Sequence, residues 1–370
     1  MNFRCIFNVF LVSLILLIGS QTFVYAQTGG YVEGPRAIGS WTPRNSLDSV
    51  EGVALNGDFA YLAVSANQDN SSYIQLLDVF DVTDPSDPHE ADPIEIPLVI
   101  MAILYANNKI YVGAGSELKI FNVRDPMAPF SVANLSQHST VCDVVVVDPY
   151  IYIADHSGSL MIANESGNLY PCLSFANDYW CFGIFVSGNY AYTATGSQGL
   201  VIWDVSNKTS PTIVGTGDTG DNVYSIAPYG ADKAVLGGRA GYVAVFDITS
   251  KTDPTLLGEI DITSDINEIK VSGDSAIVAD YTNGIVTLDL STGTPTQNKL
   301  LYPTGNRGYA VEIDGQYIYG GMGFSGLMIW DLEAATSYTR TSVGFSIAEV
   351  TLIGLGSFLV LVFYHKRSKK

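Results

Sequence analysis

The sequence predicts an all-β fold: a seven-bladed β-propeller of four-stranded blades, with an N-terminal strand closing the last blade and a C-terminal transmembrane helix following the propeller. Three observations predict this fold. A unit of about 42 residues, built of short alternating strands, recurs seven times. The seventh copy lacks a fourth strand, whereas an unmatched strand precedes the first copy. An apolar segment followed by a basic cluster ends the sequence.

Residues 1–26 have the layout of a secretory signal peptide. Arg4 precedes an apolar run from Phe7 to Ile18, and the segment closes with Val24-Tyr25-Ala26. A positive start, an apolar middle and small or apolar residues at the cut are typical of a cleaved signal. Cleavage is predicted after Ala26, and an uncleaved N-terminal anchor is the alternative.

The repeated unit is clearest in its fourth copy. Phe182–Val186, Gly188–Ala194 and Gly199–Ser206 read as three strands joined by turns, and Pro211–Gly215 adds a fourth. Four to eight such units in a row are the signature of a β-propeller, assigned here to residues 27–335. The same point of the second strand recurs at Tyr61, Tyr111, Tyr152, Tyr192, Val235, Ile277 and Tyr319.

The two ends of the propeller complement one another. The seventh copy runs from Gly315 to Leu332 and stops before a fourth strand. Pro35–Gly39, ahead of the first copy, matches Pro211–Gly215 in the fourth copy. We therefore expect Pro35–Gly39 to be the outer strand of blade seven, because an uncovered edge strand invites aggregation.

The C-terminal part divides into a stalk at 336–342, an apolar segment at 343–364 and a basic end at 365–370. The apolar segment has the length that a membrane-spanning helix needs, although Glu349 within it is expected near the outer interface. A basic cluster beside an apolar run is typical of the cytoplasmic flank. The predicted location is therefore the cell membrane, as a single-pass protein with its body outside.

One Asp per copy recurs at the end of the third strand, at Asp204, Asp247, Asp289 and Asp331. A ring of functional acids is one interpretation of this pattern. Each Asp, however, stands where the strand enters a turn, and Asp at that place accepts backbone N–H groups of the turn. The structural interpretation is preferred.

Gly199-Leu200-Val201-Ile202-Trp203-Asp204-Val205-Ser206, followed by Pro211, resembles the LVIVD repeat of bacterial and archaeal surface proteins. The resemblance covers roughly residues 35–332 and is specific in blades four to seven. It departs most in blade three, at Ala163–Ser166, where the third strand is uncertain. The resemblance implies a cell-surface propeller without catalytic residues. Gly344-Phe345-Ser346 before the apolar run is also similar to archaeal sorting tails, so removal by a sortase-like enzyme is an alternative to a retained helix.

The charge balance excludes some partners. The chain has 37 Asp+Glu and 18 Lys+Arg. Leaving out Arg4, Glu349 and the four basic tail residues leaves 36 acidic and 13 basic residues, about −23 for the exported body. So acidic a body is not expected to bind nucleic acid or anionic lipid, which need basic patches. The expected function is a surface-anchored binding, adhesion or scaffold module for an extracellular protein or glycan, and no oligomeric state is indicated.

Catalytic patterns are weak. The four His are His89, His138, His156 and His365, and no His-x-x-x-His pair is present for a metal. No catalytic residue, cofactor or metal is therefore predicted, and the protein is not expected to be an enzyme. The alternative is a propeller hydrolase or lyase with a site at the central channel, which a ring of convergent His, Asp or Arg would favour.

Propeller function is expected in loops. Turns from one blade's outer strand to the next blade's inner strand share a rim with turns between second and third strands. The candidate binding residues on that rim are His138, Tyr179, Trp180, Asp218, Asp221, Asn222, Asp261, Asp265, Asn267 and Arg307. The second set of turns adds Asp155, Asp280 and Phe324. Asp218 and Asp221 form a weak calcium candidate that lacks the full ligand pattern.

Two kinds of covalent modification are predicted for the exported body. Candidate N-glycosylation sites in Asn-x-Ser/Thr triplets are Asn70, Asn134, Asn164 and Asn207. Cys172 and Cys181 are the disulfide candidate, which would leave Cys142 free. Three buried thiols without a disulfide are the alternative.

Overall fold

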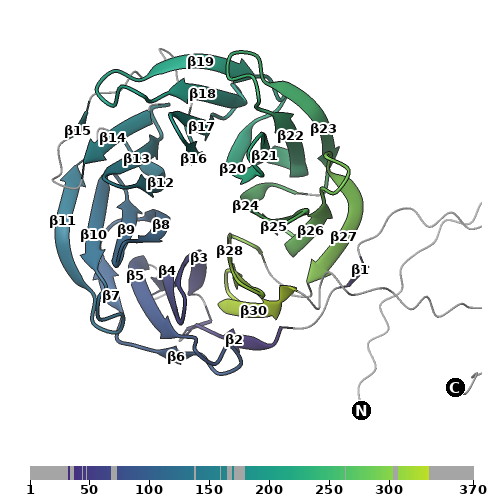
Figure 1. The fold of residues 1–370 in the computed structure, drawn as a ribbon. Helices are drawn as coiled ribbons and strands as arrows, with labels where there is room; N and C mark the ends of the chain where they lie inside the picture. The colour runs from purple at the N-terminus through teal and green to yellow at the C-terminus, as the bar shows by residue number, and fades with distance from the viewer. Residues whose placement is uncertain are drawn as a thin grey trace, which may run out of the picture. The chain divides into compact units, whose positions relative to one another are not determined.

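The computed structural model describes residues 32–33, 37–43, 45–46, 48–67, 73–136, 139–158, 160–164, 169–170, 180–262, 264–302 and 307–332. Seven sheets, antiparallel except for the pair of β1 (Val32–Glu33) with β27 (Thr296–Tyr302), are arranged in a ring (Figure 1). The seven-bladed propeller with four-stranded blades is therefore confirmed. The predicted signal (1–26), stalk (336–342), transmembrane helix (343–364) and basic tail (365–370) lie outside the described residues. In the part that is described, no helix is long and apolar enough to cross a membrane.

In blades one to six the strands run outward in sequence order, whereas the outermost strand of blade seven, β2 (Gly39–Trp41), comes from the N-terminal part of the chain. The inner strands are β3 (Ser49–Asn56), β8 (Ile100–Ala106), β12 (Val141–Val147), β16 (Gly183–Ser187), β20 (Val223–Tyr229), β24 (Ile266–Ser272) and β28 (Ala310–Asp314). The second strands are β4 (Phe59–Asn67), β9 (Lys109–Ala114), β13 (Tyr150–Asp155), β17 (Tyr190–Ala194), β21 (Lys233–Gly238), β25 (Ser275–Asp280) and β29 (Tyr317–Gly321).

The third and fourth strands complete the blades. The third strands are β5 (Tyr73–Asp81), β10 (Glu117–Asn122), β14 (Leu160–Asn164), β18 (Leu200–Asp204), β22 (Tyr242–Asp247), β26 (Gly284–Asp289) and β30 (Leu327–Asp331). The fourth strands are β6 (His89–Glu90), β11 (Phe130–Ser136), β15 (Leu169–Tyr170), β19 (Thr212–Gly217), β23 (Thr255–Asp261), β27 (Thr296–Tyr302) and β2 (Gly39–Trp41). A short 3₁₀ turn, η1 (Arg239–Gly241), joins β21 to β22.

The predicted closure of blade seven is confirmed in partner and register. β2 pairs antiparallel with β30, and Gly39 lies opposite Ile329 as Gly215 lies opposite Ile202 in blade four. The strand bounds differ from the prediction, because β2 begins at Gly39 and runs to Trp41 instead of spanning Pro35–Gly39. Residues 34–36 lie outside the described residues. On the inner side, a bridge between Val50 and Gly323 also joins blade one to blade seven.

Two short strands were not predicted. β1 (Val32–Glu33) pairs in parallel with β27, so the N-terminal segment follows the outer edge of blade six before it completes blade seven. β7 (Ile94–Ile96) pairs with β5 beyond the place where β6 pairs with it. The fourth strand of blade one is therefore split into two pieces. The uncertain third strand of blade three is present as β14.

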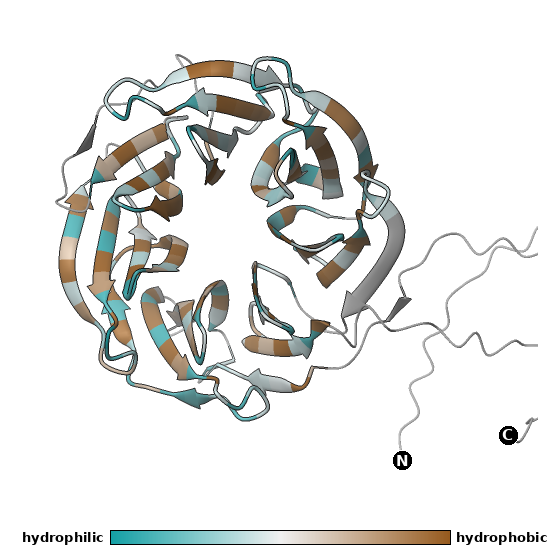
Figure 2. Cartoon of the chain, in the orientation of Figure 1, coloured by the Kyte–Doolittle hydropathy of each residue, from teal (hydrophilic) through white to brown (hydrophobic). Residues whose placement is uncertain are grey.

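The core lies between neighbouring blades, where both faces of each sheet are covered. The second-strand tyrosines Tyr61, Tyr111, Tyr152 and Tyr192 are buried, as are Trp203 and Trp330 of the third strands. The indole Nε1 of Trp203 donates to Thr193 Oγ1 at 3.0 Å, which satisfies its polar atom inside the core. Figure 2 shows apolar residues along the strands and hydrophilic residues in the outer turns.

The repeated Asp has the structural role predicted for it. Asp204 Oδ1, Asp247 Oδ1 and Asp289 Oδ1 each accept the backbone N–H two residues later at 2.8 Å. Hydrogen bonds donated by the hydroxyl group of Ser206 and, to a smaller extent, by its backbone N–H lower the pKa of Asp204 below its usual range. These acids therefore fix the turns between third and fourth strands and do not converge on a site.

Candidate functional site

The channel mouth is formed by the first residues of the seven inner strands. In five blades the pairing of inner and second strand skips one residue, which marks a β-bulge. Bulges bend a strand and re-aim a side chain, often beside functional sites. The bulge residues are Glu51, Met101, Cys142, Tyr224 and Asn267, and Phe182 and Tyr309 occupy the same place in blades four and seven.

A cavity of about 120 Å³ opens at this mouth, lined by residues from all seven blades. Its lining includes three aromatic residues and three acidic residues, namely Phe182, Tyr224 and Tyr309, and Glu51, Asp143 and Glu268. Burial raises the pKa of Glu51, and side-chain hydrogen bonds to Ser65 and Ser49 oppose this shift.

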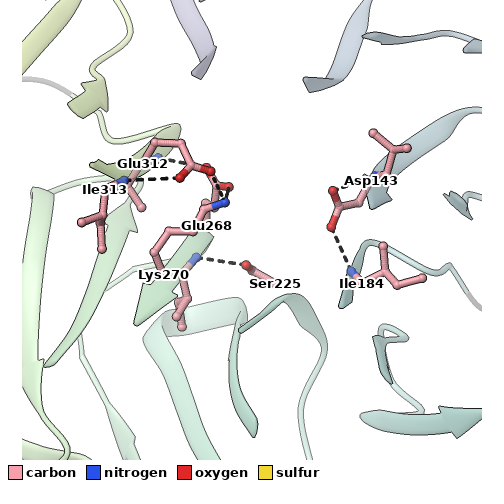
Figure 3. Close-up of polar contacts among 10 residues, drawn as sticks. Asp143, Ile184, Ser225, Glu268, Lys270, Glu312 and Ile313 are labelled. Carbon is pink, nitrogen blue, oxygen red and sulfur yellow. Dashed lines mark hydrogen bonds and ion pairs between the residues drawn. The ribbon is translucent and has the colours of Figure 1, made fainter. Parts of the chain in front are cut away.

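Below the mouth, blades six and seven share an ion cluster (Figure 3). Lys270 Nζ lies 3.0 Å from Glu268 Oε1 and also contacts Glu312 Oε1. Burial alone would lower the pKa of Lys270, but Glu268 and Glu312 raise it above its usual range. Burial raises the pKa of Glu268, and Lys270 opposes the shift. One cation thus serves two carboxylates in the channel wall.

Asp143 faces the channel from blade three, across the opening from the ion cluster (Figure 3). Its Oδ2 accepts the backbone N–H of Ile184 at 2.9 Å, and its Oδ1 accepts that of Val144 at 2.8 Å. Burial raises the pKa of Asp143 to about 7, although these hydrogen bonds and Lys270 oppose the shift. Near neutral pH the carboxyl group is therefore present in both its protonated and its ionised form.

Three channel residues at equivalent positions also join neighbouring blades. Asp143 accepts from blade four, Ser225 Oγ accepts the Ile269 N–H of blade six at 3.0 Å, and Glu268 Oε2 accepts the Val311 N–H of blade seven at 2.9 Å. Each bond satisfies a backbone N–H group in the inner strand of the following blade, which points toward the preceding blade. Part of the channel's polarity is therefore structural.

The protonation of Asp143 gives a testable pH dependence. The folded-state pKa of about 7 exceeds the ordinary 3.8, so the folded chain holds this proton more tightly. This contribution to the free energy of unfolding is present below pH about 4 and lost as the pH rises through about 7. In Asp143→Asn, the free energy of unfolding should fall less between pH 4 and 8 than in the wild type, as measured by urea titration of the full chain.

The control for this measurement is Asp58→Asn, which removes an exposed carboxylate from a turn between inner and second strands, at the opposite end of the channel. Its pH profile should match the wild type. Glu51 and Glu268, which line the same cavity and whose pKa burial also raises, are present in all three proteins, so their contributions cancel in the comparison. The Cys142 thiol, whose pKa burial raises to about 12, stays protonated throughout this range. Parallel profiles for wild type and Asp143→Asn would show that Asp143 does not titrate in this range.

An aromatic cluster lies beside the mouth between blades three and five. The Trp180 ring stacks on His156 with centroids 4.2 Å apart, and its edge meets Phe182 at 5.7 Å. Phe182 in turn meets Tyr224 at 5.0 Å. Trp180 remains 50% exposed, so one of the largest side chains of the molecule is presented to solvent at the rim.

A second cluster lies between blades six and seven. The Arg307 guanidinium lies over the Tyr281 ring, with Cζ 4.5 Å from the ring centroid, and donates to Tyr309 Oη at 3.5 Å. The rings of Tyr281 and Tyr309 meet edge to face at 5.8 Å. The hydrogen bond with Tyr309 raises the pKa of Arg307. Both clusters therefore end in a ring that lines the cavity.

The other predicted rim residues divide by exposure. Asp218 and Asp261 are exposed, whereas Asp221, Asn222, Asp265 and Asn267 are partly buried. Asp265 Oδ1 accepts the Ala240 N–H at 2.8 Å, and Asn267 Nδ2 donates to the Gly308 carbonyl at 2.7 Å. These two residues thus tie adjacent blades together. His138 and Tyr179 lie outside the described residues.

The weak calcium candidate forms an ordinary turn. Asp218 Oδ1 accepts the Gly220 N–H at 2.8 Å, and Asp221 Oδ1 accepts the Asn222 N–H at 2.6 Å. Among the residues that the structure describes, no group of three or more His, Cys, Asp or Glu could hold a metal ion. Asp155 and Asp280 are fully buried with Oδ1 accepting bonds within their own turns, whereas Phe324 is 48% exposed.

The modification candidates are only partly covered. Asn207 is exposed in a turn, where its Oδ1 accepts the Thr209 hydroxyl at 2.9 Å, and Asn134 is exposed on β11. Asn164 ends β14 and is partly buried, and Asn70 lies outside the described residues. Cys142 and Cys181 are buried with free thiols. Cys172 lies outside the described residues, so its pairing with Cys181 stays a prediction.

Sequence reasoning missed the channel residues themselves. Asp143, Glu268, Lys270 and Glu312 stand in the inner strands, where a simple in-and-out alternation was expected. A signal was present, because charged residues interrupt apolar runs at Val141–Val147 and Ile266–Val271. The bulges hid it, since one extra residue shifts which side chains face the channel.

Comparison with known proteins supports the fold. The LVIVD repeat is recognised at residues 49–93, 139–169, 182–219 and 265–299, in blades one, three, four and six. Blade three, where the resemblance was expected to be weakest, is among them. No curated protein matches the sequence significantly. The crystal structure of the computationally designed Ika8 protein is similar with a TM-score of 0.56 and 11% identity, covering 80% of this chain and 100% of that one. At this identity the likeness shows the fold alone.

Proposed function

The chain is an LVIVD-repeat β-propeller, and we propose that it is exported, anchored at the cell surface, and binds an extracellular protein or glycan through the face around the channel mouth. The location rests on the sequence, with its N-terminal signal layout, its apolar segment at 343–364 and its basic end. An acidic body of about −23 suits a surface protein that must stay soluble beside its neighbours.

The observation that carries the binding role is the gathering of exposed apolar side chains at one rim. Val99, Met101, Trp180 and Phe324 are each about half exposed; Met101 stands at the bulge of β8, and the other three come from turns that surround the mouth. Single exposed apolar residues are normal on any protein, but several around a cavity with a polar rim are typical of an interaction site. Trp is also the residue most enriched among binding hot spots.

Replacing Trp180 with alanine is expected to weaken binding at least about tenfold, as is usual for a hot-spot aromatic. The full chain would be displayed on cells, and its binding measured to purified envelope fractions of the native host. Protease treatment of a fraction identifies a protein ligand, and periodate treatment identifies a glycan.

The matched control is Phe130→Ala, which removes an aromatic ring of 59% exposure from the outer strand of blade two, away from the mouth. This variant should bind as the wild type does. Absence of saturable binding to either fraction, or an equal loss in the two variants, would contradict the proposed function.

A propeller hydrolase or lyase is the second candidate. The observation that favours it is Asp143, whose pKa of about 7 suits a general acid or base. Its two oxygens both accept backbone N–H groups, however, and this geometry gives it a structural role already. Turnover of a glycan in the binding experiment, abolished in Asp143→Asn, would favour the enzyme.

A further inference from the structure

The cavity at the channel mouth combines aromatic faces with carboxyl groups. Phe182, Tyr224 and Tyr309 line it together with three acids, whereas none of the described residues that line it is Lys, Arg or His. Lys270, in the channel wall below the mouth, is already shared between two glutamates. The lining is therefore complementary to positive charge.

Tyrosine and phenylalanine faces attract cations through the ring quadrupole, most strongly where water is excluded. The protein uses this contact at the same rim, where the Arg307 guanidinium lies 4.5 Å from the centroid of Tyr281 and hydrogen-bonds Tyr309. The same kind of cation–aromatic contact recurs elsewhere in the propeller, where the ammonium groups of Lys208 and Lys251 each lie over two tyrosine rings.

For the carboxyl groups of the cavity, the effect of burial on the pKa exceeds that of their hydrogen bonds and ion pairs. Burial raises the pKa of Glu51, Asp143 and Glu268 alike, which means that their ionised forms are poorly solvated there. A cation in the cavity would stabilise all three ionised forms at once. The volume of about 120 Å³ suits one charged head group, because sites for drug-sized ligands span roughly 300–1,000 Å³.

We propose that the channel mouth binds an organic cation, a protonated amine or guanidinium group, between the rings of Phe182, Tyr224 and Tyr309 and the carboxylates of Glu51, Asp143 and Glu268. This proposal rests on the proposed binding role of the same face and adds the chemistry that its ligand must offer. The cation comes from a small free amine or from a Lys or Arg side chain of a protein ligand.

The test is calorimetric titration of the full chain in detergent with n-butylammonium, agmatine and a short Gly-Arg-Gly peptide, and with n-butanol as the neutral analogue. The cations should bind saturably and n-butanol should not. A peptide that binds at least about tenfold more tightly than the free amines indicates a protein ligand, and equal affinities indicate that the head group suffices. No saturable binding of any cation, or equal binding of n-butanol, overturns the proposal.

Two cavity variants sharpen the test. Glu51→Gln keeps the size of the side chain and removes its charge, and Phe182→Leu removes a ring; each should weaken cation binding about tenfold. Asp58→Asn, which removes the same charge as Glu51→Gln from the opposite end of the channel, should leave binding unchanged. If Asp58→Asn weakens binding as much as Glu51→Gln, the effect is that of net charge and the cavity is not the site.

Acidity provides a second measurement that does not depend on any variant. Binding should weaken as the pH falls below about 7, because protonation of Asp143, and of Glu51 and Glu268 whose pKa burial also raises, removes the charge that the ligand meets. Affinity that is constant from pH 8 to 5 would contradict the proposed site. Loss of cation binding with intact envelope binding refutes only this proposal, and the reverse result refutes only the proposed function.

Discussion

Replacing Gly39 with alanine is expected to destabilise the protein by about 3 kcal/mol and to open the ring between its first and last blades. A Cβ at Gly39 would lie 1.7 Å from the carbonyl oxygen of Pro85, in the turn between the third and fourth strands of blade one. The backbone fixes the position of the new Cβ, and the carbonyl oxygen that it meets also belongs to the backbone. No side-chain rotation therefore relieves this clash. β2 would have to leave either β30 or blade one.

The controls separate packing from closure. Ser40→Ala changes the neighbouring exposed residue of the same strand and should leave the unfolding transition unchanged. Gly215→Ala produces the same kind of clash inside the ring, where its Cβ would lie 2.1 Å from the Lys251 carbonyl oxygen. Both glycine variants should lower the urea midpoint, but only Gly39→Ala should expose β30 as an edge and aggregate. A Gly39→Ala protein with the wild-type midpoint would contradict the closure.

The register of the closing strand could be predicted because this strand aligns with the fourth strands of the other repeats. Gly39 corresponds to Gly215 in sequence, and both glycines face a carbonyl oxygen of the next blade's turn. The strand bounds could not be predicted, because the pairing continues to Trp41 only where β30 offers partners down to Leu327. The parallel strand β1 has no counterpart in the other blades, and a repeat cannot predict what occurs once.

The rim residues named from the sequence differ in exposure and in hydrogen bonding. Trp180 and Arg307 are exposed at the rim, whereas the side chains of Asp265 and Asn267 form hydrogen bonds between blades. Exposure and pairing depend on neighbours roughly 40 residues away, which follow from the ring and not from local sequence. In five blades a bulge in the inner strand then decides which residue faces the channel, and sequence alternation alone cannot place it.

Removing the shared cation of the channel wall is the second change with a large expected effect. In Lys270→Met, Glu268 and Glu312 keep their places without the ammonium group that lies between them. Removing one partner of a fully buried ion pair costs roughly 3–5 kcal/mol. Here the three side chains retain between 24% and 32% of their exposure, so we expect a loss of about 2 kcal/mol.

Lys119→Met is the matched control, because Lys119 also pairs with a glutamate, Glu117, at 2.7 Å, but serves one carboxylate on the third strand of blade two. Its cost should stay below about 1 kcal/mol. Adding Glu312→Gln to Lys270→Met should recover part of the loss, and the double-mutant cycle gives the coupling between the two residues. Equal costs for the two lysine variants would mean that the channel position adds nothing.

The pH dependence of Lys270→Met identifies the cause of its instability. Without Lys270, burial and repulsion from Glu312 raise the pKa of Glu268 further above the value that this group has when unfolded. Carboxyl groups with raised pKa stabilise the fold while protonated and cease to do so as the pH rises through the folded-state pKa. The difference in the free energy of unfolding between wild type and Lys270→Met should therefore be small near pH 4 and grow toward pH 8. A difference that is constant over this range would assign the loss to the packing of the lysine stem instead of its charge.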